Sequence, residues 1–248
     1  MLKEERQNVI LHEVNLHNRV LTTYLVERLG VSEDTIRRDL NELADLGRII
    51  KVHGGALSKS FHNAFSPTDV YARSEKKIIA QKAAQLIENG MFVLTTGGTT
   101  ILELARALPQ QLHATFFTGS LPVAFEYSQH PHIEVIVIGD RLLKNSKITV
   151  GGAAIEQIRQ VKADLCFLGT NAIDLRDGLT DNDLDVVQIK KAMIESSSKV
   201  VSLAISEKIN TSQRLKVCNI NSIDTIITEL EPDHELLRPY AAAGLEIR

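Results

Sequence analysis

The chain has 248 residues, with 28 Lys or Arg, 31 Asp or Glu and a formal net charge of −3. Hydrophobic residues make up 44% of it, which is enough for a packed core and argues against wholesale disorder. No apolar run approaches the roughly 20 residues that span a bilayer, and the charged start of the chain is not typical of a signal peptide. We therefore expect a cytoplasmic protein with one small and one larger domain.

The cysteine content gives little sign of special chemistry. Cys166 and Cys218 each lie in an apolar, strand-like run. Two buried, reduced thiols are the favoured interpretation, over a disulfide or a metal site. We predict no metal and no cofactor.

The first two helices are indicated by apolar spacing and by their ends. Lys3–His17 is predicted to be a helix with Val9, Ile10, Val14 and Leu16 facing inward. Thr22 is expected to cap a second helix over Thr22–Leu29, which Gly30 closes. Its buried side is predicted to consist of Tyr24, Leu25 and Leu29.

The segment from Ser32 to Gly47 has the strongest pattern in the chain. Ser32 is a favourable N-cap, and Gly47 tolerates the left-handed backbone that ends helices. One face is apolar and consists of Ile36, Leu40, Leu43 and Leu46. The other face is polar and consists of Thr35, Arg37, Arg38 and Asn41. Two short helices joined by a glycine-containing turn predict a helix-turn-helix.

The following residues extend this to a winged helix-turn-helix domain over residues 1–58. Residues 48–52 read as a strand, and the turn at 53–55 leads into a second strand. In the major groove, arginine can bind guanine and asparagine can bind adenine, while other polar side chains contact phosphates. The predicted DNA-binding residues are Thr22, Thr23, Ser32, Thr35, Arg37, Arg38, Asn41, Lys51 and His53.

Charge alone does not indicate a nucleic-acid partner. Residues 1–58 hold eight Lys or Arg and nine Asp or Glu, a balance of −1, whereas residues 35–59 have a balance of +2. The alternative is that Arg37 and Arg38 pair with Glu33, Asp34 or Asp39 on a solvated helix face. We favour DNA binding because cap, turn, paired helix and wing coincide, and we interpret Asp39 as an arginine-orienting or inter-helix partner.

The remainder of the chain predicts an α/β domain over residues 71–248, after a linker over 59–70. The linker contains polar spacers and a proline. A helix over 71–89 follows, with Ile78, Ile79, Ala83, Leu86 and Ile87 on one face. Strands are then predicted at 91–95, 114–117, 133–138, 165–168, 200–205 and 225–228, and helices at 102–108, 121–129, 153–161 and 186–196. This alternation favours a mostly parallel sheet flanked by helices.

Glycine, threonine and serine recur where these strands end. Ligands of parallel sheets lie beyond the carboxyl ends of the strands, and glycine loops at helix starts suit phosphate or another anion. The alternative is that the glycines and threonines only form loops and that the lysines are ordinary surface residues. We favour a pocket because the same residue types recur at several successive strand ends. The candidate effector-binding residues are Thr96, Gly97, Gly98, Thr99, Thr100, Thr118, Gly119, Ser120, Gly152, Asn171, Lys190 and Lys208.

The sequence resembles the DeoR family of bacterial transcriptional regulators. The resemblance covers nearly the whole chain and is carried in the head by Arg6, Ile10, Val14, Ser32, Thr35, the run Ile36-Arg37-Arg38-Asp39-Leu40 and His53-Gly54-Gly55-Ala56. The body is similar to the family's sensor domain, which implies a fold like ribose-5-phosphate isomerase and a phosphorylated sugar or polyol effector. The matching positions there are Gly98-Thr99-Thr100, Gly178-Leu179-Thr180, Lys190 and Lys208.

Several positions depart from the family pattern. Thr96 and Ile205 stand where the family commonly has aspartate, Gly119 stands where it has asparagine, and the helix acid expected at 186–188 is missing, although Asp183 and Asp185 lie nearby. Loss of these groups argues against isomerase catalysis. It leaves three possibilities for the effector: a less hydroxylated phosphate, a different anion, or none.

We therefore expect a transcriptional regulator that represses a carbohydrate or polyol operon. Its partners would be double-stranded operator DNA and a small phosphorylated effector, with no membrane partner, no catalytic residues and a homodimeric or homotetrameric assembly. The alternatives are a sugar-phosphate isomerase-like enzyme with an accessory head, and an orphan regulator whose body only dimerises the heads.

Overall fold

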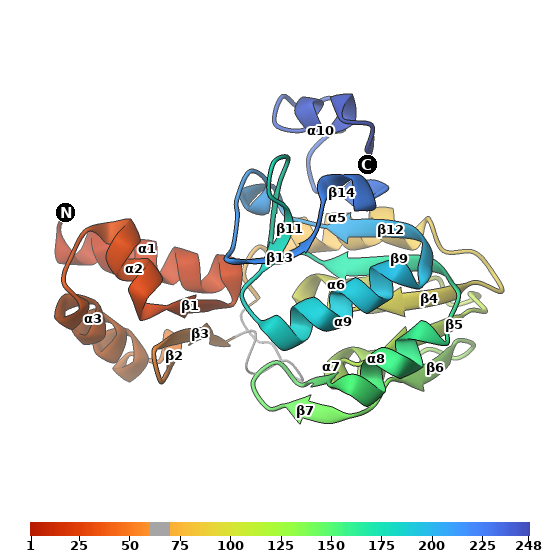
Figure 1. Cartoon of the computed structure of the whole chain (residues 1–248), viewed down its shortest axis with the longest axis horizontal. Helices are drawn as coiled ribbons and strands as arrows, with labels where there is room; N and C mark the ends of the chain where they lie inside the picture. The colour runs from red at the N-terminus through yellow and green to blue at the C-terminus, as the bar shows by residue number, and fades with distance from the viewer. Residues whose placement is uncertain (60–69) are drawn as a thin grey trace. The chain divides into compact units, whose positions relative to one another are not determined.

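The computed structural model describes residues 1–59 and 70–248, and it comprises two compact units, residues 1–71 and 72–248 (Figure 1). Each unit is described by itself. Most of the predicted linker lies outside the described residues. The domain limits at 58 and 70 remain predictions.

Three helices form the first unit around one small core. They are α1 (Lys3–His17), α2 (Thr22–Leu29) and α3 (Glu33–Asp45). The bounds of α1 and α2 are those predicted. The core collects one apolar face from each helix together with strand residues, namely Ile10, Val14, Val20, Leu25, Ile36, Leu40, Leu43, Ile49 and Ala56.

The ends of α3 follow from its capping residues. The Ser32 hydroxyl accepts a hydrogen bond from the Thr35 N–H at 3.3 Å, as expected of an N-cap. At the other end Gly47 has φ +66°, and the N–H of Arg48 donates to the Leu43 carbonyl at 2.8 Å. Leu46 was predicted to be buried, but it is 71% exposed because the helix ends one residue before it.

The expected cap of α2 is also different. Leu21 is the N-cap residue, and Thr22 is the first residue of the helix, so the prediction that Thr22 caps it was wrong. The chain enters α2 directly from a strand, β1 (Arg19–Leu21), which the sequence analysis did not predict. The extended backbone of β1 therefore takes the place of a loop with a capping side chain.

The wing is a three-stranded antiparallel sheet. Its strands β1, β2 (Ile49–Val52) and β3 (Gly55–Ser58) lie in the order β1-β3-β2. Val52 pairs with Gly55, so His53 and Gly54 form a two-residue turn, and Gly54 has φ +76°. The predicted hairpin is therefore present, and β1 closes it against α1 and α2.

The second unit is built on a seven-stranded sheet. The strands are β4 (Phe92–Thr95), β5 (Thr115–Thr118), β6 (Glu134–Val137), β9 (Ala163–Gly169), β12 (Ser197–Leu203), β14 (Thr225–Ile227) and β15 (Glu246–Ile247). Their order is β15-β14-β12-β9-β4-β5-β6, and every neighbouring pair is parallel. The α/β fold with a mostly parallel sheet is confirmed.

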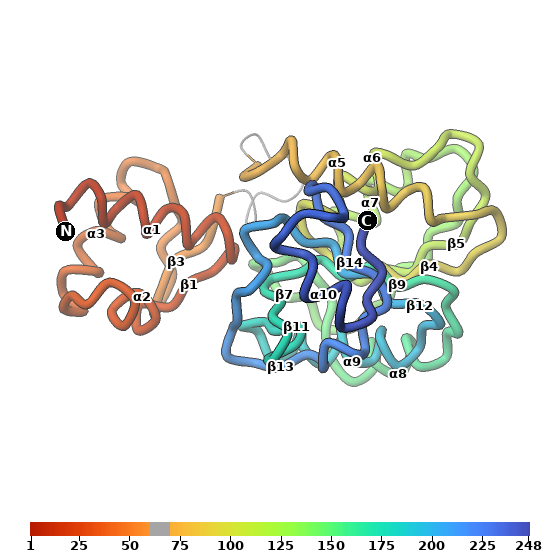
Figure 2. Tube along the Cα trace, turned by 90° about the horizontal axis from the view of Figure 1, so that it is seen from above, coloured from red at the N-terminus to blue at the C-terminus, as the bar shows by residue number. Residues whose placement is uncertain are grey.

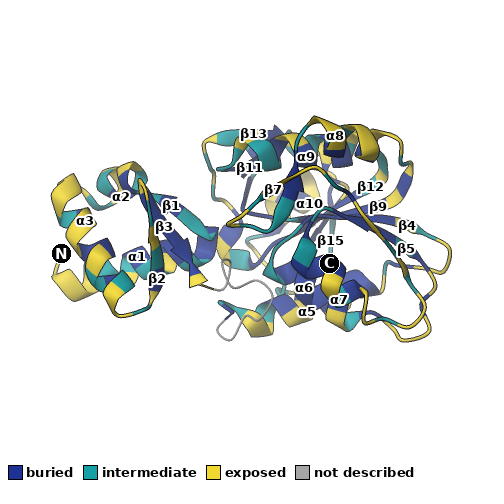
Figure 3. Cartoon of the chain, turned by 90° about the horizontal axis from the view of Figure 1, so that it is seen from below, coloured by how far each residue is buried: buried dark blue, intermediate teal, exposed yellow. Residues whose placement is uncertain are grey.

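Helices cover both faces of this sheet. Figure 2 shows α5 (Arg73–Ala84), α6 (Thr99–Ala107) and α7 (Leu121–Tyr127) on one side, and α8 (Gly152–Arg159) and α9 (Leu184–Glu195) on the other. The strands between them, such as β9 and β12, are largely buried (Figure 3). Ile78 was predicted to be buried but is 42% exposed, because its neighbour Ile79 faces the core and successive helical residues point about 100° apart.

Smaller elements that the sequence analysis did not predict complete the unit. A hairpin of β7 (Arg141–Leu143) and β8 (Ile148–Val150) precedes α8, and a second sheet has the order β10-β11-β13. The remaining elements are β10 (Ala172–Asp174), β11 (Gly178–Asp181), β13 (Leu215–Cys218), α10 (Arg238–Ala242) and the 3₁₀ turns Ser206–Lys208 and Ile220–Ser222. Within the described residues no helix is long and apolar enough to cross a bilayer.

The order of the strands places a switch point beside β4. The chain runs from β4 through β5 to the edge strand β6, then returns to β9 on the other side of β4 and continues outward. The loops after β4 and β9 therefore leave the sheet side by side. Open α/β sheets bind ligands at such a point, outside the carboxyl ends of the strands.

A buried ion pair joins α1 to α3 beneath the exposed face of α3. The Arg6 guanidinium donates to both carboxylate oxygens of Asp39, at 2.5 and 3.2 Å. The Asp39 side chain is 2% exposed. The prediction that Asp39 is an inter-helix partner is confirmed.

Removing the Asp39 carboxylate should loosen the first unit. Asp39→Ala leaves the guanidinium of Arg6 without its acceptor, so we expect a loss of about 2 kcal/mol. Native-state hydrogen exchange at the α3 amides of the full chain would measure it. Glu42→Ala, which removes the exposed partner of Lys3, is the control and should cost much less. Equal losses in the two variants would contradict this account.

Candidate functional site

The outer face of α3 presents a basic and amide surface. Arg37, Arg38 and Asn41 are exposed there, and Thr35 is half-buried. The ammonium of Lys51, from β2, donates to the Asn41 side-chain oxygen. Helix and wing therefore contribute to one continuous surface of donors that could meet bases and phosphates.

The arginines of this surface pair with acids one turn earlier. Arg37 contacts Glu33 at 2.7 Å, and Arg38 contacts Asp34 at 2.8 Å. The alternative interpretation from sequence thus describes real contacts. Both arginines are more than 60% exposed, however, and exposed i,i+4 pairs contribute only a few tenths of a kcal/mol. Phosphate could replace these partners at little cost.

The other predicted DNA-binding residues differ in exposure. Thr23, Ser32 and His53 are exposed, as a contact residue requires. Thr22 is buried, and its N–H donates to the Gly54 carbonyl at 2.8 Å. The structure therefore gives Thr22 a role in joining α2 to the wing turn.

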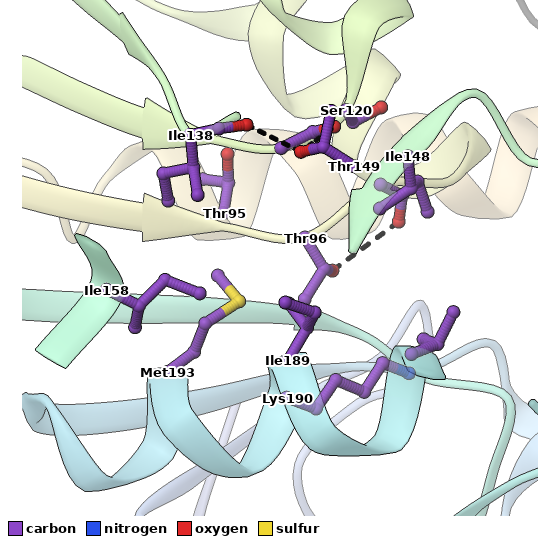
Figure 4. A pocket seen from close by; sticks show the side chains of 13 residues that line it. Thr95, Thr96, Ser120, Ile138, Ile148, Thr149, Ile158, Ile189, Lys190 and Met193 are labelled. Carbon is purple, nitrogen blue, oxygen red and sulfur yellow. Dashed lines mark hydrogen bonds between the residues drawn. The ribbon is translucent and has the colours of Figure 1, made fainter. Parts of the chain in front are cut away.

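A small pocket lies in the second unit beyond the carboxyl ends of β4, β5 and β6 (Figure 4). Loops and helices contribute its walls: Thr95, Thr96, Gly97, Gly119, Ser120, Ile138, Ile148, Thr149, Ile158, Val186, Ile189, Lys190 and Met193. Ile189 and Met193 point from α9 toward the strand ends that carry Thr95 and Ile138 (Figure 4). The pocket therefore occupies the switch-point side of the sheet.

The structure brings five of the twelve predicted effector residues to this pocket, from three separate segments. These are Thr96, Gly97, Gly119, Ser120 and Lys190. Gly98, Thr99 and Thr100 form the adjoining start of α6. The others do not line the pocket: Thr118 ends β5, Gly152 starts α8, Asn171 donates to Asp181 and Asn182, and Lys208 donates to the Thr170 carbonyl.

The helix starts near the pocket differ in what caps them. At α8 the Asp140 carboxylate accepts from the Ala153 N–H at 2.9 Å, and at α9 Asp183 caps the helix by accepting from two N–H groups. At α6, no acceptor among the described residues takes a hydrogen bond from the N–H groups of Gly98, Thr99 or Thr100. The start of α6 therefore retains the capacity to bind an anion.

Beside the loop, a buried ion pair fixes the position of Lys190. Its ammonium donates to Asp181 at 2.7 Å and to the Gly169 carbonyl at 2.8 Å. Burial alone would raise the pKa of Asp181, but Lys190 and the hydrogen bonds from Asn182 and Asn171 lower it below its usual value. Asp181 was not among the predicted site residues, although its position directly after Gly178-Leu179-Thr180 could have indicated it.

Two further buried lysines lie near this pair. Burial, with the charges of Lys76 and Lys190, lowers the pKa of Lys208 to about 7. Burial also lowers the pKa of Lys76 to about 8, against the nearby carboxylates of Glu75, Glu103 and Glu207. Both pKa values fall chiefly because burial disfavours the charged ammonium.

Both cysteines are free thiols. Cys166 is buried in β9 and Cys218 is half-buried in β13. Burial raises the pKa of the Cys166 thiol to about 12 and that of Cys218 to about 11. Both are therefore protonated and unreactive at neutral pH.

Comparison with known proteins identifies relatives over the whole chain. Residues 6–61 match the DeoR-like helix-turn-helix domain, and residues 72–230 match the DeoR C-terminal sensor domain. The HTH-type transcriptional regulator GolR of Listeria innocua is 31% identical over 100% of this chain and 99% of its own. The glycerol-3-phosphate regulon repressor of Escherichia coli is 32% identical over 94% of this chain and 93% of its own.

Among solved structures, ribose 5-phosphate isomerase A of Neisseria gonorrhoeae is similar at a TM-score of 0.41. It is 15% identical and covers 56% of this chain and 54% of its own.

The lowered pKa of Lys208 predicts that stability depends on pH. Between pH 7 and the ordinary lysine value of 10.5 the unfolded chain holds a proton here that the folded chain lacks. The free energy of unfolding should therefore rise with pH, by up to about 1.4 kcal/mol per unit from this group.

Urea unfolding at pH 7 and pH 9 tests this expectation. The gain between the two values should be larger for the wild type than for Lys208→Met, which removes the titrating group. Equal gains would show that Lys208 keeps its proton in the folded chain.

Proposed function

The chain belongs to the DeoR family of transcriptional regulators, and we propose that it represses a carbohydrate or polyol operon by binding operator DNA through α3 and the wing. As a member of this family, the chain is a DNA-binding regulator. Repression is supported by its relative in Escherichia coli, the glycerol-3-phosphate regulon repressor. A cytoplasmic location follows from this proposal.

The single observation that supports the DNA-binding surface is the separation of charge around α3. Asp39 is buried against Arg6, whereas Arg37, Arg38 and Lys51 face outward. A helix with outward arginines fits the major groove, and the wing lysine suits the adjoining backbone. We propose a homodimer or homotetramer, because two such heads would meet a two-fold symmetric operator.

The effector part of the proposal rests on the start of α6. A small phosphorylated metabolite would place its anionic group on the N–H groups of 98–100, beside Lys190 and Ser120. We expect the heads to adopt two arrangements, one that binds the operator and one that does not. Effector binding would change the affinity for the operator only as far as the effector binds these two arrangements with different affinities.

An isomerase-like enzyme is the weaker alternative. Asp183 and Asp185 were its candidate acids, but Asp183 caps α9 and Asp185 pairs with Arg141 at 2.6 Å. Neither lines the pocket, and no carboxylate among the described residues does. The pocket therefore lacks a general base in reach of a bound sugar.

The two arginines of α3 give the direct test of the DNA-binding proposal. Replacing both by alanine in the full chain should weaken binding about 100-fold or more, because each substitution removes a charged group that binds base or phosphate. Fluorescence anisotropy on a fragment that the wild type selects from a random DNA pool would measure it. The slope of log affinity against log salt should also fall, by about one for each phosphate that the variant no longer binds.

Lys3→Ala is the control, since it removes an exposed positive charge on α1 that pairs with Glu42 and leaves Arg37 and Arg38 in place. It should leave affinity within a few-fold of the wild type. Undiminished binding by the double variant would refute this assignment of the surface.

A further inference from the structure

The interior of the pocket is apolar. Ile138, Ile158, Ile189 and Met193 are buried there, while Ile148 and Val186 stand half-buried at its mouth. Sugar hydroxyls need hydrogen-bonding partners, because a buried polar group without one is costly. These walls offer methyl and methylene groups instead.

The hydroxyl groups that line the pocket are mostly engaged with the protein. Thr149 donates to the Ile138 carbonyl at 2.5 Å (Figure 4). Thr96 accepts from the Gly169 N–H at 2.7 Å, and Thr95 accepts from the Tyr127 hydroxyl at 3.5 Å. They therefore have little capacity left for a ligand with many hydroxyls.

Ser120 is the exception. Its side chain is 2% exposed, and its hydroxyl has no hydrogen-bond partner among the described residues. A Cβ placed on Gly97 would lie 3.0 Å from the Ser120 oxygen, so this hydroxyl faces the loop before α6. It is a buried donor beside the free N–H groups of α6.

Lys190 adds one more donor at the same end. An ammonium has three N–H groups, and two of those of Lys190 are used by Asp181 and the Gly169 carbonyl. Gly169 itself packs against the Gly97 carbonyl, which a Cβ at 169 would meet at 2.7 Å. The free hydroxyl of Ser120 and the start of α6 thus lie beside Gly97, and Lys190 is held against Gly169 next to it.

From the apolar interior of the pocket and the free donors at one end of it, we propose that the effector is a phosphate monoester with a short, mainly apolar carbon body and few hydroxyls. Its phosphate binds beside Gly97, and its carbon body contacts the apolar wall of the pocket. The inference rests on the proposed anion site and adds the chemical class of what it binds. It selects the less hydroxylated phosphate from the possibilities that the sequence leaves open.

A pair of probes of nearly equal size tests the class. Glycerol 3-phosphate is n-propyl phosphate with two added hydroxyls. Titration calorimetry on the full chain should show n-propyl phosphate binding at least tenfold more tightly, because the added hydroxyls find few partners. Affinity should also rise about fourfold per methylene from methyl to n-propyl phosphate. Inorganic phosphate is the reference for the anion site alone.

Two proline variants separate the anion site from the class of ligand. Thr99→Pro removes one N–H at the first position of α6, where proline suits a helix, and should weaken every phosphate probe. Leu184→Pro makes the same change at the first position of α9, whose Asp183 cap does not use that N–H, and should change nothing. Met193→Gln should reduce the preference for n-propyl phosphate while keeping inorganic phosphate binding.

The outcomes are distinguishable. Tighter binding of glycerol 3-phosphate, with both probes weakened by Thr99→Pro, would overturn the inferred class and leave the proposed anion site intact. No binding of any probe, or binding that Thr99→Pro does not change, would overturn the anion site and this inference with it. The expected order in the wild type decides the question even if Met193→Gln does not fold.

Discussion

The second unit depends on one constraint: the first N–H groups of α6, at the switch point of its parallel sheet, have no hydrogen-bond acceptor among the described residues. The first N–H groups of a helix need acceptors, and the chain supplies them at α8 through Asp140 and at α9 through Asp183. At α6 it supplies glycines and an open pocket instead. The strand order then brings the loops after β4, β5 and β9 around this point, so the uncapped start of α6 adjoins the pocket.

The first unit presents positive charge on α3 although residues 1–58 have a charge balance of −1. The placement of its charged side chains makes this possible. Asp39 is buried under α3 against Arg6, and the arginines of α3 lie outside. The remaining acids beside them are held in exposed pairs that contribute little. The net charge of the first unit therefore does not indicate the basic surface of α3, which depends on where the individual side chains lie.

The sequence allowed most of the fold to be predicted, because long periodic segments and capping residues are local signals; α1, α2 and the order of helices and strands in the body agree with the structure. Short elements such as β1, the β7–β8 hairpin and β11 depend on tertiary pairing and carried no such signal. Thr22 was misplaced for this reason, since β1 runs directly into α2, whereas Leu46 was misplaced because α3 ends at Asp45. The loops of the pocket could be predicted, but not that Asp181 would hold Lys190 or that apolar residues of α8 and α9 would form the interior.

The most direct measurement for this account is the operator affinity of the full chain as a phosphate monoester is added. With n-propyl phosphate near saturation of the pocket, the dissociation constant for DNA should change at least several-fold in the wild type, and by linkage DNA should change the affinity for the probe by the same factor. Thr99→Pro should abolish the response at that concentration. An operator affinity that stays constant while calorimetry shows the pocket filled would contradict the claim that this site controls DNA binding.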